Sequence, residues 1–287
     1  MCVYGREREV EQLAYARPGA VVLAGDPGVG KSVVLAAAQV RAESDGAVAP
    51  APVTIRRSPA ALQIALLDGL GAAVALLVRN EGLARTAGRH VADAARRMAK
   101  TRLDDLASAV GKVLLGAVRA RLGGEVAGAI EEFARELTTS VDERLAARIS
   151  SAGDSDVIDM IAGFAAETAA LADDRDVLLA LDNAERLDED DVRRLADLVD
   201  LLPDRVMIRL AYATADESAQ AHLDALREAG AAVVELDGLD PGLVAAWLAD
   251  EGVPASMLSE TMRVTAGYPL HVQDAVDALK AGAAWPT

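Results

Sequence analysis

Aromatic side chains are scarce in this sequence, at 3% of residues, although hydrophobic residues make up 52%. Alanine, leucine and valine must therefore fill the core, and this composition favours helices. Cysteine is scarcer still. Because Cys2 is the only one, the sequence offers no intramolecular disulfide and no cysteine-based zinc site. We therefore expect a reducing compartment, and the cytoplasm is the default.

Positive charge is also in deficit, because 45 acidic residues outnumber 29 basic ones and leave a net charge of -16. Nucleic-acid binding needs a surplus of lysine and arginine, so the composition does not favour nucleic acid as a partner. The sequence has no uncharged run of about 18 residues, and we expect no membrane span. Charged residues from Arg6 to Glu9 stand where an export signal would be apolar, which also favours the cytoplasm.

Five short apolar segments alternate with segments of helical character. The first ends in a glycine-rich turn that leads into an apolar helix. Continuous apolar runs joined by helices are typical of parallel strands that are covered on both faces. The sequence therefore predicts an α/β fold with a five-stranded parallel sheet, and we expect its strands at residues 20–25, 53–57, 177–182, 206–213 and 232–236.

Two helical regions extend this core. Residues 82–172 contain no strand candidate and predict a mostly helical insertion, of which residues 85–121 are basic. The basic part is either a helical hairpin packed on the core with a solvated face, or a surface for a partner or nucleic acid. After the last strand, residues 239–287 predict a small C-terminal helical lid domain. The nucleotide-binding core is then expected at residues 1–238, with the insertion inside it.

The segment GDPGVGKS lies between the first strand and its helix, and it matches the phosphate-binding loop pattern G-x-x-x-x-G-K-[ST]. Glycines let such a loop wrap so that backbone amides face phosphate oxygens, and the helix N-terminus adds partial positive charge. Lys31 is expected to reach the β and γ phosphates, and Ser32 to ligate Mg²⁺. The residues assigned to ATP or ADP here are Gly25, Asp26, Pro27, Gly28, Val29, Gly30, Lys31, Ser32 and Val33.

Two carboxylates follow the third predicted strand. Asp182 ends the apolar run VLLALD, so a parallel sheet brings it to the same edge as the loop, where it should hold Mg²⁺. On its own, such an Asp could equally be a helix cap or a turn former. Glu185 is the nearest further carboxylate that could polarise an attacking water. The alternative is a solvated or capping Glu at the start of the next helix.

Further motifs, in order along the chain, resemble the STAND branch of AAA-like ATPases. These motifs are Tyr4-Gly5-Arg6-Glu7, GDPGVGKS, LDNAERLDED, LAYATAD and Gly267-Tyr268-Pro269. The resemblance implies a P-loop NTPase of AAA/STAND type with strand order 5-1-4-3-2. It also implies that Tyr4, Gly5 and Arg6 lie beside the adenine, that Thr214 is a sensor residue and that Pro269 senses the nucleotide from the lid.

Two departures from this family bear on hydrolysis. Asn183 stands where AAA+ motors carry a Glu, and Asp216 stands where many STAND proteins carry an Arg. The resemblance therefore implies a slow signalling ATPase. It would act as a conformational and oligomerisation switch with a homo-oligomer in the ATP state, and its effector domains or protein partner would lie outside this chain. Two alternatives stay open: a DNA-linked AAA+ ATPase supported by the basic residues 85–121, and an ATP-binding scaffold that does not hydrolyse.

Overall fold

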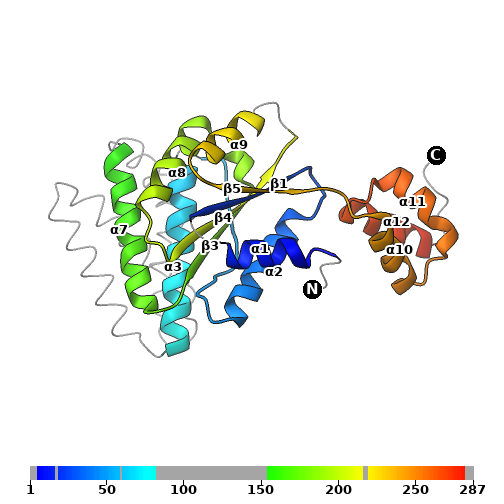
Figure 1. Ribbon diagram of the computed structural model, residues 1–287, viewed down its shortest axis with the longest axis horizontal. Coiled ribbons are helices and arrows are strands. Elements are labelled where there is room, and N and C mark those ends of the chain that lie inside the picture. The colour runs from blue at the N-terminus through cyan, green and yellow to red at the C-terminus, as the bar shows by residue number, and fades with distance from the viewer. Residues whose placement is uncertain (1–4, 17–18, 59, 82–153, 216–218, 282–287) are drawn as a thin grey trace, which may run out of the picture.

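The computed structural model describes residues 5–16, 19–58, 60–81, 154–215 and 219–281. A parallel five-stranded sheet forms its centre, with the strand order β2-β3-β4-β1-β5 (Figure 1). This is the order 5-1-4-3-2 that the sequence predicted, read from the other edge. The strands are β1 (Ala20–Gly25), β2 (Val53–Thr54), β3 (Val177–Asp182), β4 (Val206–Ala213) and β5 (Ala232–Leu236).

The register of β1 decides where its loop emerges. β1 lies between β4 and β5, and its last residue, Gly25, pairs with Ala213 on one side and Leu236 on the other. The carboxyl ends of three strands therefore meet at one edge of the sheet. In parallel α/β sheets, ligands bind outside the carboxyl ends of the strands.

β2 is shorter than predicted, because the regular strand ends at Thr54 rather than at residue 57. Pro50 and Pro52 lie just upstream and have no amide hydrogen to give to a ladder. Residues 48–55 therefore pair with β3 through an interrupted ladder. Val48 forms an isolated bridge to Val177, and the amide of Ile55 still donates to the carbonyl of Asp182 at 2.8 Å.

Helices cover both faces of the sheet (Figure 1). On one face, α1 (Glu7–Tyr15) and α2 (Lys31–Ser44) bury Leu13, Val34 and Leu35 against side chains of β1. On the other face the sheet packs against four helices: α3 (Ala61–Glu81), α7 (Asp154–Ala172), α8 (Glu189–Leu201) and α9 (Ala219–Glu228). Alternate residues of β1 face the two helical layers, as a strand in a three-layer fold requires.

The described part of the predicted insertion is α7. It packs between α3 and α8, and Ile161 and Phe164 are almost fully buried in the core of that layer. Residues 85–121, the predicted basic stretch, lie outside the described residues. None of the helices in the described ranges is long and apolar enough to cross a membrane.

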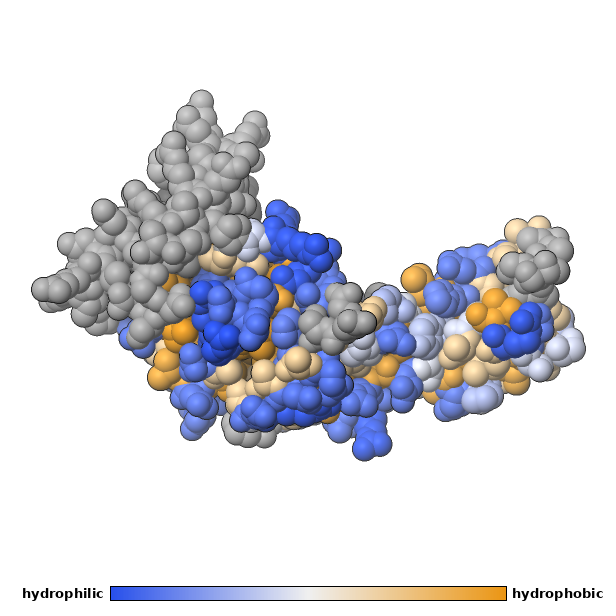
Figure 2. Space-filling model, turned by 90° about the horizontal axis from the view of Figure 1, so that it is seen from above, coloured by the Kyte–Doolittle hydropathy of each residue, from blue (hydrophilic) through white to orange (hydrophobic). Residues whose placement is uncertain are grey.

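The three C-terminal helices have a core of their own. They are α10 (Pro241–Asp250), α11 (Leu258–Thr265) and α12 (Pro269–Lys280), with a short 3-10 turn, η2 (Ala255–Met257), before α11. Val244, Trp247 and Val272 pack together among them. Asp240 begins α10, because its carboxylate accepts a hydrogen bond from the amide of Leu243 at 2.9 Å. This group, called the lid below, extends from the sheet as a narrower lobe (Figures 1 and 2).

Candidate nucleotide-binding site

The loop between β1 and α2 has a conformation that its glycines make accessible. Gly28 and Gly30 have φ values of 85° and 100°, which side-chain-bearing residues rarely adopt. Gly25 is required for a different reason, since a Cβ there would lie 2.5 Å from the carbonyl oxygen of Leu236 in β5. The loop therefore turns tightly at the sheet edge and directs the N-terminus of α2 toward it. The first-turn amides and the dipole of such a helix favour an anion.

Lys31 begins α2, and its side chain folds back over the loop. Its Nζ donates hydrogen bonds to the carbonyl oxygens of Gly25 and Asp26, both at 2.8 Å. Desolvation lowers the pKa of Lys31, and the nearby carboxylates of Glu185, Asp182 and Asp26 partly offset this effect. The ammonium group thus lies near three carboxylates, and within the described residues its hydrogen bonds go to carbonyl oxygens of the loop.

Ser32 and Asp182 are brought together across 150 positions of sequence. The Ser32 hydroxyl donates to Oδ1 of Asp182 at 3.0 Å, and the amide of Asn183 donates to the same oxygen at 2.9 Å. A hydroxyl and a carboxylate are hard oxygen ligands, the type that Mg²⁺ prefers. The described residues contain no cluster of three or more metal-binding side chains. This agrees with the way Mg²⁺ is bound, through one or two protein oxygens together with phosphates and water.

Glu185 lies one turn beyond Asp182. Asn183 has a left-handed backbone with φ 62°, and the 3-10 turn η1 (Ala184–Arg186) follows it. This turn brings Oε2 of Glu185 within 3.2 Å of the amide of Ala213, the last residue of β4. Asn tolerates the left-handed conformation better than most residues do, which gives Asn183 a structural reason for its place. The carboxylates of Glu185 and Asp182 both lie close enough to Lys31 to act on its charge.

Thr214 follows β4 and is joined to the loop twice. Its amide donates to the carbonyl of Gly25 at 3.1 Å, and its hydroxyl donates to Oδ1 of Asp26 at 3.0 Å. Val29 lies beneath the loop at 1% exposure and anchors it in the core of the α1–α2 layer. Pro27 is exposed, and so is the side chain of Val33 in the first turn of α2.

The lid contacts the loop through the start of α12. The amide of Leu270 donates to the carbonyl of Gly28 at 3.3 Å, and a Cβ on Gly30 would lie 3.6 Å from the Pro269 ring. Tyr268 donates to Oδ2 of Asp26 at 2.6 Å. Sequence reasoning placed Pro269 at the site but gave Tyr268 no role. Its position directly before Pro269, in a chain with few aromatics, was the available signal.

The N-terminal segment lies between the core and the lid. Gly5 has φ 61°, and a Cβ there would overlap the side chain of Leu243 in α10. Arg6 is buried, donates a hydrogen bond to the carbonyl of Asp237 and pairs with Glu9 at 3.7 Å. Desolvation lowers the pKa of Arg6. Tyr4, which the sequence also assigned to the adenine, lies outside the described residues.

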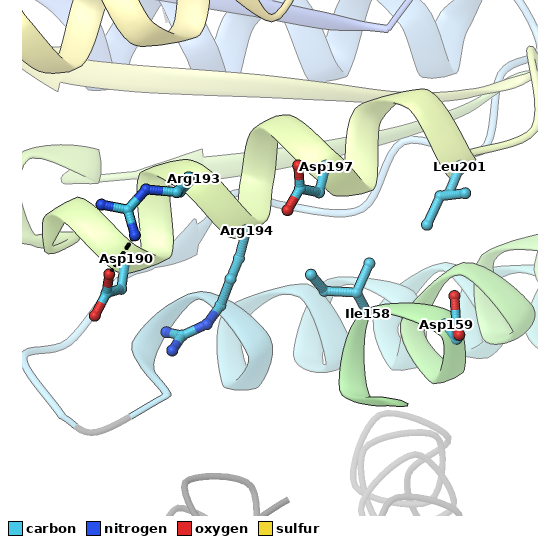
Figure 3. Close-up of a pocket in the computed structure, with 7 residues that line it drawn as sticks. All are labelled: Ile158, Asp159, Asp190, Arg193, Arg194, Asp197 and Leu201. Carbon is cyan, nitrogen blue, oxygen red and sulfur yellow. Dashed lines mark hydrogen bonds and ion pairs between the residues drawn. The ribbon is translucent and has the colours of Figure 1, made fainter. Parts of the chain in front are cut away.

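A pocket of about 230 Å³ between α7 and α8 is a separate feature (Figure 3). Arg193 on its rim forms an exposed ion pair with Asp190 at 2.8 Å. No residue of the β1–α2 loop lines the pocket, and neither do Asp182 or Glu185. The pocket lies apart from the glycine-rich loop and from Ser32 and Asp182, so the arrangement at the sheet edge is the stronger candidate for a functional site.

A glycine-shaped loop at the end of β1, a lysine folded over it, and a serine bonded to the aspartate that ends β3 define a P-loop nucleotide-binding fold. Comparison with known families gives the same answer. The chain belongs to the AAA ATPase domain family, whose model matches residues 3–211, and it is a nucleotide-binding ATPase domain of this kind. The comparison with curated proteins finds no match.

Proposed function

We propose that this chain binds Mg-ATP and hydrolyses it slowly, as a nucleotide-dependent conformational switch within a larger regulator. The observation that carries this proposal is the contact between the loop and the lid. The amide of Leu270 in α12 donates directly to the loop carbonyl of Gly28. A ligand held by this loop would therefore act on the lid as well as on the core, and it could bias a two-state arrangement of the two.

Each group at the sheet edge has a role in this proposal. Lys31 would exchange its bonds to loop carbonyls for phosphate oxygens, which carry full negative charge and bind an ammonium group more strongly. Ser32 and Asp182 would hold Mg²⁺, which lowers the charge repulsion between phosphate groups. Thr214, next to the loop, would report the terminal phosphate. Gly5 and Arg6, between the lid and the core, would border the base of the nucleotide. Pro269 would border its phosphates.

Slow turnover follows from the groups beside Asp182. The side chain of Asn183 is an amide, which cannot accept a proton from water at neutral pH. Glu185 can accept one, but its carboxylate also holds the amide of Ala213. That hydrogen bond fixes one oxygen of the carboxylate and leaves the other to orient a water molecule. Glu185 is therefore proposed as the water-positioning group of a slow enzyme.

The experiment measures phosphate release from Mg-ATP, and ATP affinity, for the wild type, Lys31→Ala and Glu185→Gln. Lys31→Ala should weaken ATP binding at least about tenfold, because it removes a charge-assisted contact. Glu185→Gln should bind ATP as the wild type does and release phosphate about 100-fold more slowly. Glu189→Gln is the matched control, because Glu189 is an exposed glutamate of α8 that pairs with Arg193, and it should change neither quantity.

Two results would contradict the proposal. If the wild type binds ATP but releases no phosphate above the Lys31→Ala background, the chain alone is a binding scaffold. If Glu185→Gln turns over at the wild-type rate, another group positions the water. The DNA-linked alternative depends on residues 85–121, and nothing in the described ranges of the chain favours it.

A further inference from the structure

Asp26, the second residue of the loop, divides its carboxylate between two partners. Oδ1 accepts a hydrogen bond from the Thr214 hydroxyl at 3.0 Å, and Oδ2 accepts one from the Tyr268 hydroxyl at 2.6 Å. Thr214 follows the central strand β4, whereas Tyr268 directly precedes α12 in the lid. A single exposed side chain therefore joins the loop, the sheet and the lid.

Each of these two partners, Thr214 and Tyr268, also makes a second contact that helps to fix its position. Thr214 is fixed by the bond from its amide to the carbonyl of Gly25 at 3.1 Å. The Tyr268 ring stacks on His271, with ring centroids 5.7 Å apart and planes inclined by 27°. The two hydroxyl groups are thus presented to Asp26 by rigid surroundings, and this reduces the entropy lost when the bonds form.

The charge of Asp26 agrees with this arrangement. The hydrogen bonds from Tyr268 and Thr214 hold the pKa of Asp26 below its ordinary value, and the Asp26 carboxylate raises the pKa of Tyr268. At neutral pH the pair is therefore an ionised carboxylate and a protonated phenol. Hydrogen bonds of this charged type are stronger than those between neutral groups.

We propose that Asp26 is a positioning residue that connects Thr214 to the lid: a phosphate at Thr214 competes with the Asp26 carboxylate for the Thr214 hydroxyl, and it thereby disturbs the contact through which Asp26 holds the lid. Thr214 has a single hydroxyl proton. While this hydroxyl donates its hydrogen bond to Asp26, it cannot donate one to a phosphate oxygen. A terminal phosphate there would also place a second negative charge near Asp26, and like charges at short range repel.

This proposal rests on the proposed function, because it assumes that Thr214 meets the terminal phosphate of ATP. Its consequence concerns the choice of nucleotide. Asp26 would favour ADP over ATP, and ATP would loosen the bond between Asp26 and Tyr268. The first residues of α12 would then be released from the loop.

The first experiment uses the full chain without nucleotide and measures hydrogen exchange at the amide of Leu270, which reports the contact with Gly28. Asp26→Ala and Tyr268→Phe should each raise the exchange rate about threefold, as expected for losing one exposed hydrogen bond. The double variant should exchange no faster than the faster single variant, because both substitutions break the same bond. Phe keeps the ring that stacks on His271, so Tyr268→Phe removes the hydroxyl alone.

Tyr15→Phe is the matched control. The Tyr15 hydroxyl bonds to Asp45 and Arg41 beside α1, so its loss should leave Leu270 unchanged. Multiplied rates in the double variant, or unchanged rates in both single variants, would overturn the proposal. A merely structural role of Asp26 in shaping the loop predicts multiplied rates, because the Tyr268 hydroxyl would then act separately.

The second experiment measures the affinities of fluorescent ATP and ADP analogues with Mg²⁺. Asp26→Ala should increase the preference for ATP over ADP about threefold or more, because it removes both the competitor for Thr214 and the negative charge. Equal changes for the two nucleotides would contradict the proposal. Failure to release phosphate would overturn the proposed function instead and would leave the nucleotide-free exchange result intact.

Discussion

Two cations of the core have the same kind of partners but different surroundings. Lys31, the first residue of α2, donates to the carbonyls of Gly25 and Asp26 in the loop that follows β1, and it is partly exposed. Arg209, in the middle of β4, has no exposed surface and donates to carbonyls that include those of Leu13 and Ala16. Desolvation lowers the pKa of both, and that of Arg209 falls to about 10.

The two cations differ in whether an external ligand could replace their carbonyl partners. Arg209 binds the end of α1, whose last turn has no basic residue of its own, and the guanidinium stabilises the negative end of that helix dipole. No external group reaches it. Lys31 holds two carbonyls in a loop open to solvent, and a phosphate could take their place. The same chemistry is therefore structural where it is sealed, and we propose that it is functional where it is accessible.

Arg209→Met should have the largest effect on stability. It removes the side-chain donor to the carbonyls of Leu13 and Ala16, and each buried group left without a partner costs about 1–3 kcal/mol, so we expect the free energy of unfolding to fall by about 3 kcal/mol. Denaturant titration measures this. The control is Arg205→Met, since Arg205 is 43% exposed and pairs with Asp174, and it should lose less than about 1 kcal/mol. Similar losses for both variants would break the comparison.

Lys31→Ala should show the opposite pattern. Without nucleotide, its free energy of unfolding should stay within about 1 kcal/mol of the wild type, because water can solvate the freed loop carbonyls. With Mg-ATP at about 100 times its dissociation constant, the wild type should gain about 2.7 kcal/mol, and the variant should gain much less. Thermal melts with and without Mg-ATP test both halves. A large loss without nucleotide would mean that Lys31 is as structural as Arg209.

Two carboxylates give a smaller form of the same contrast. Asp26 is exposed, and hydrogen bonds lower its pKa, whereas Asp191 in the first turn of α8 has a side chain only 3% exposed. Desolvation, and then the neighbouring Asp188, raise the pKa of Asp191 to about 6. The folded state therefore binds this proton more tightly than the unfolded state does. Its contribution to stability grows as the pH falls from above 6 toward 4.

Asp191→Asn should remove this dependence of stability on pH. The free energy of unfolding of the variant, minus that of the wild type, should be about 1 kcal/mol larger at pH 7.5 than at pH 5. The reason is that the folded wild type carries the buried charge of Asp191 mainly at the higher pH. Denaturant titrations at the two pH values give the difference. Asp190→Asn serves as the control, because Asp190 is exposed on the same turn. A difference that does not depend on pH would show that Asp191 is not penalised by burial.

Local pattern was enough to predict most of the sheet. Four mainly apolar runs predicted β1, β3, β4 and β5 with the bounds that the structure has. β1, β3 and β4 are buried along almost their whole length, as continuous apolar runs in a parallel sheet should be, whereas the edge strand β5 is partly exposed. β2 was predicted too long, because Thr54 already pairs with Asp182, the last residue of β3, and a strand cannot extend its ladder beyond the end of its partner. The loop and the proximity of Ser32 to Asp182 also follow from local rules, since parallel strands bring their carboxyl ends to one edge.

Other contacts could not be read from the sequence. The bond from Tyr268 to Asp26 joins residues 242 positions apart and depends on how the lid is placed. Arg209 lies in the apolar run VMIRLAYA, where a charge looks misplaced. Its partners are backbone carbonyls, which leave no mark in side-chain composition. Both contacts depend on tertiary geometry rather than on periodicity or on a motif.

The connection between β5 and the lid limits how the lid can turn. The amide of Leu239 donates to the carbonyl of Gly267 at 2.8 Å, and a Cβ on Gly238 would lie 2.1 Å from the carbonyl oxygen of Ala266. Leu239 therefore moves as part of the lid, while Leu236 is paired with Gly25 in the sheet. The axis of any rotation must pass through the bonds of Asp237 and Gly238. Since Arg6 donates a hydrogen bond to the carbonyl of Asp237, the N-terminal segment restricts rotation about these bonds.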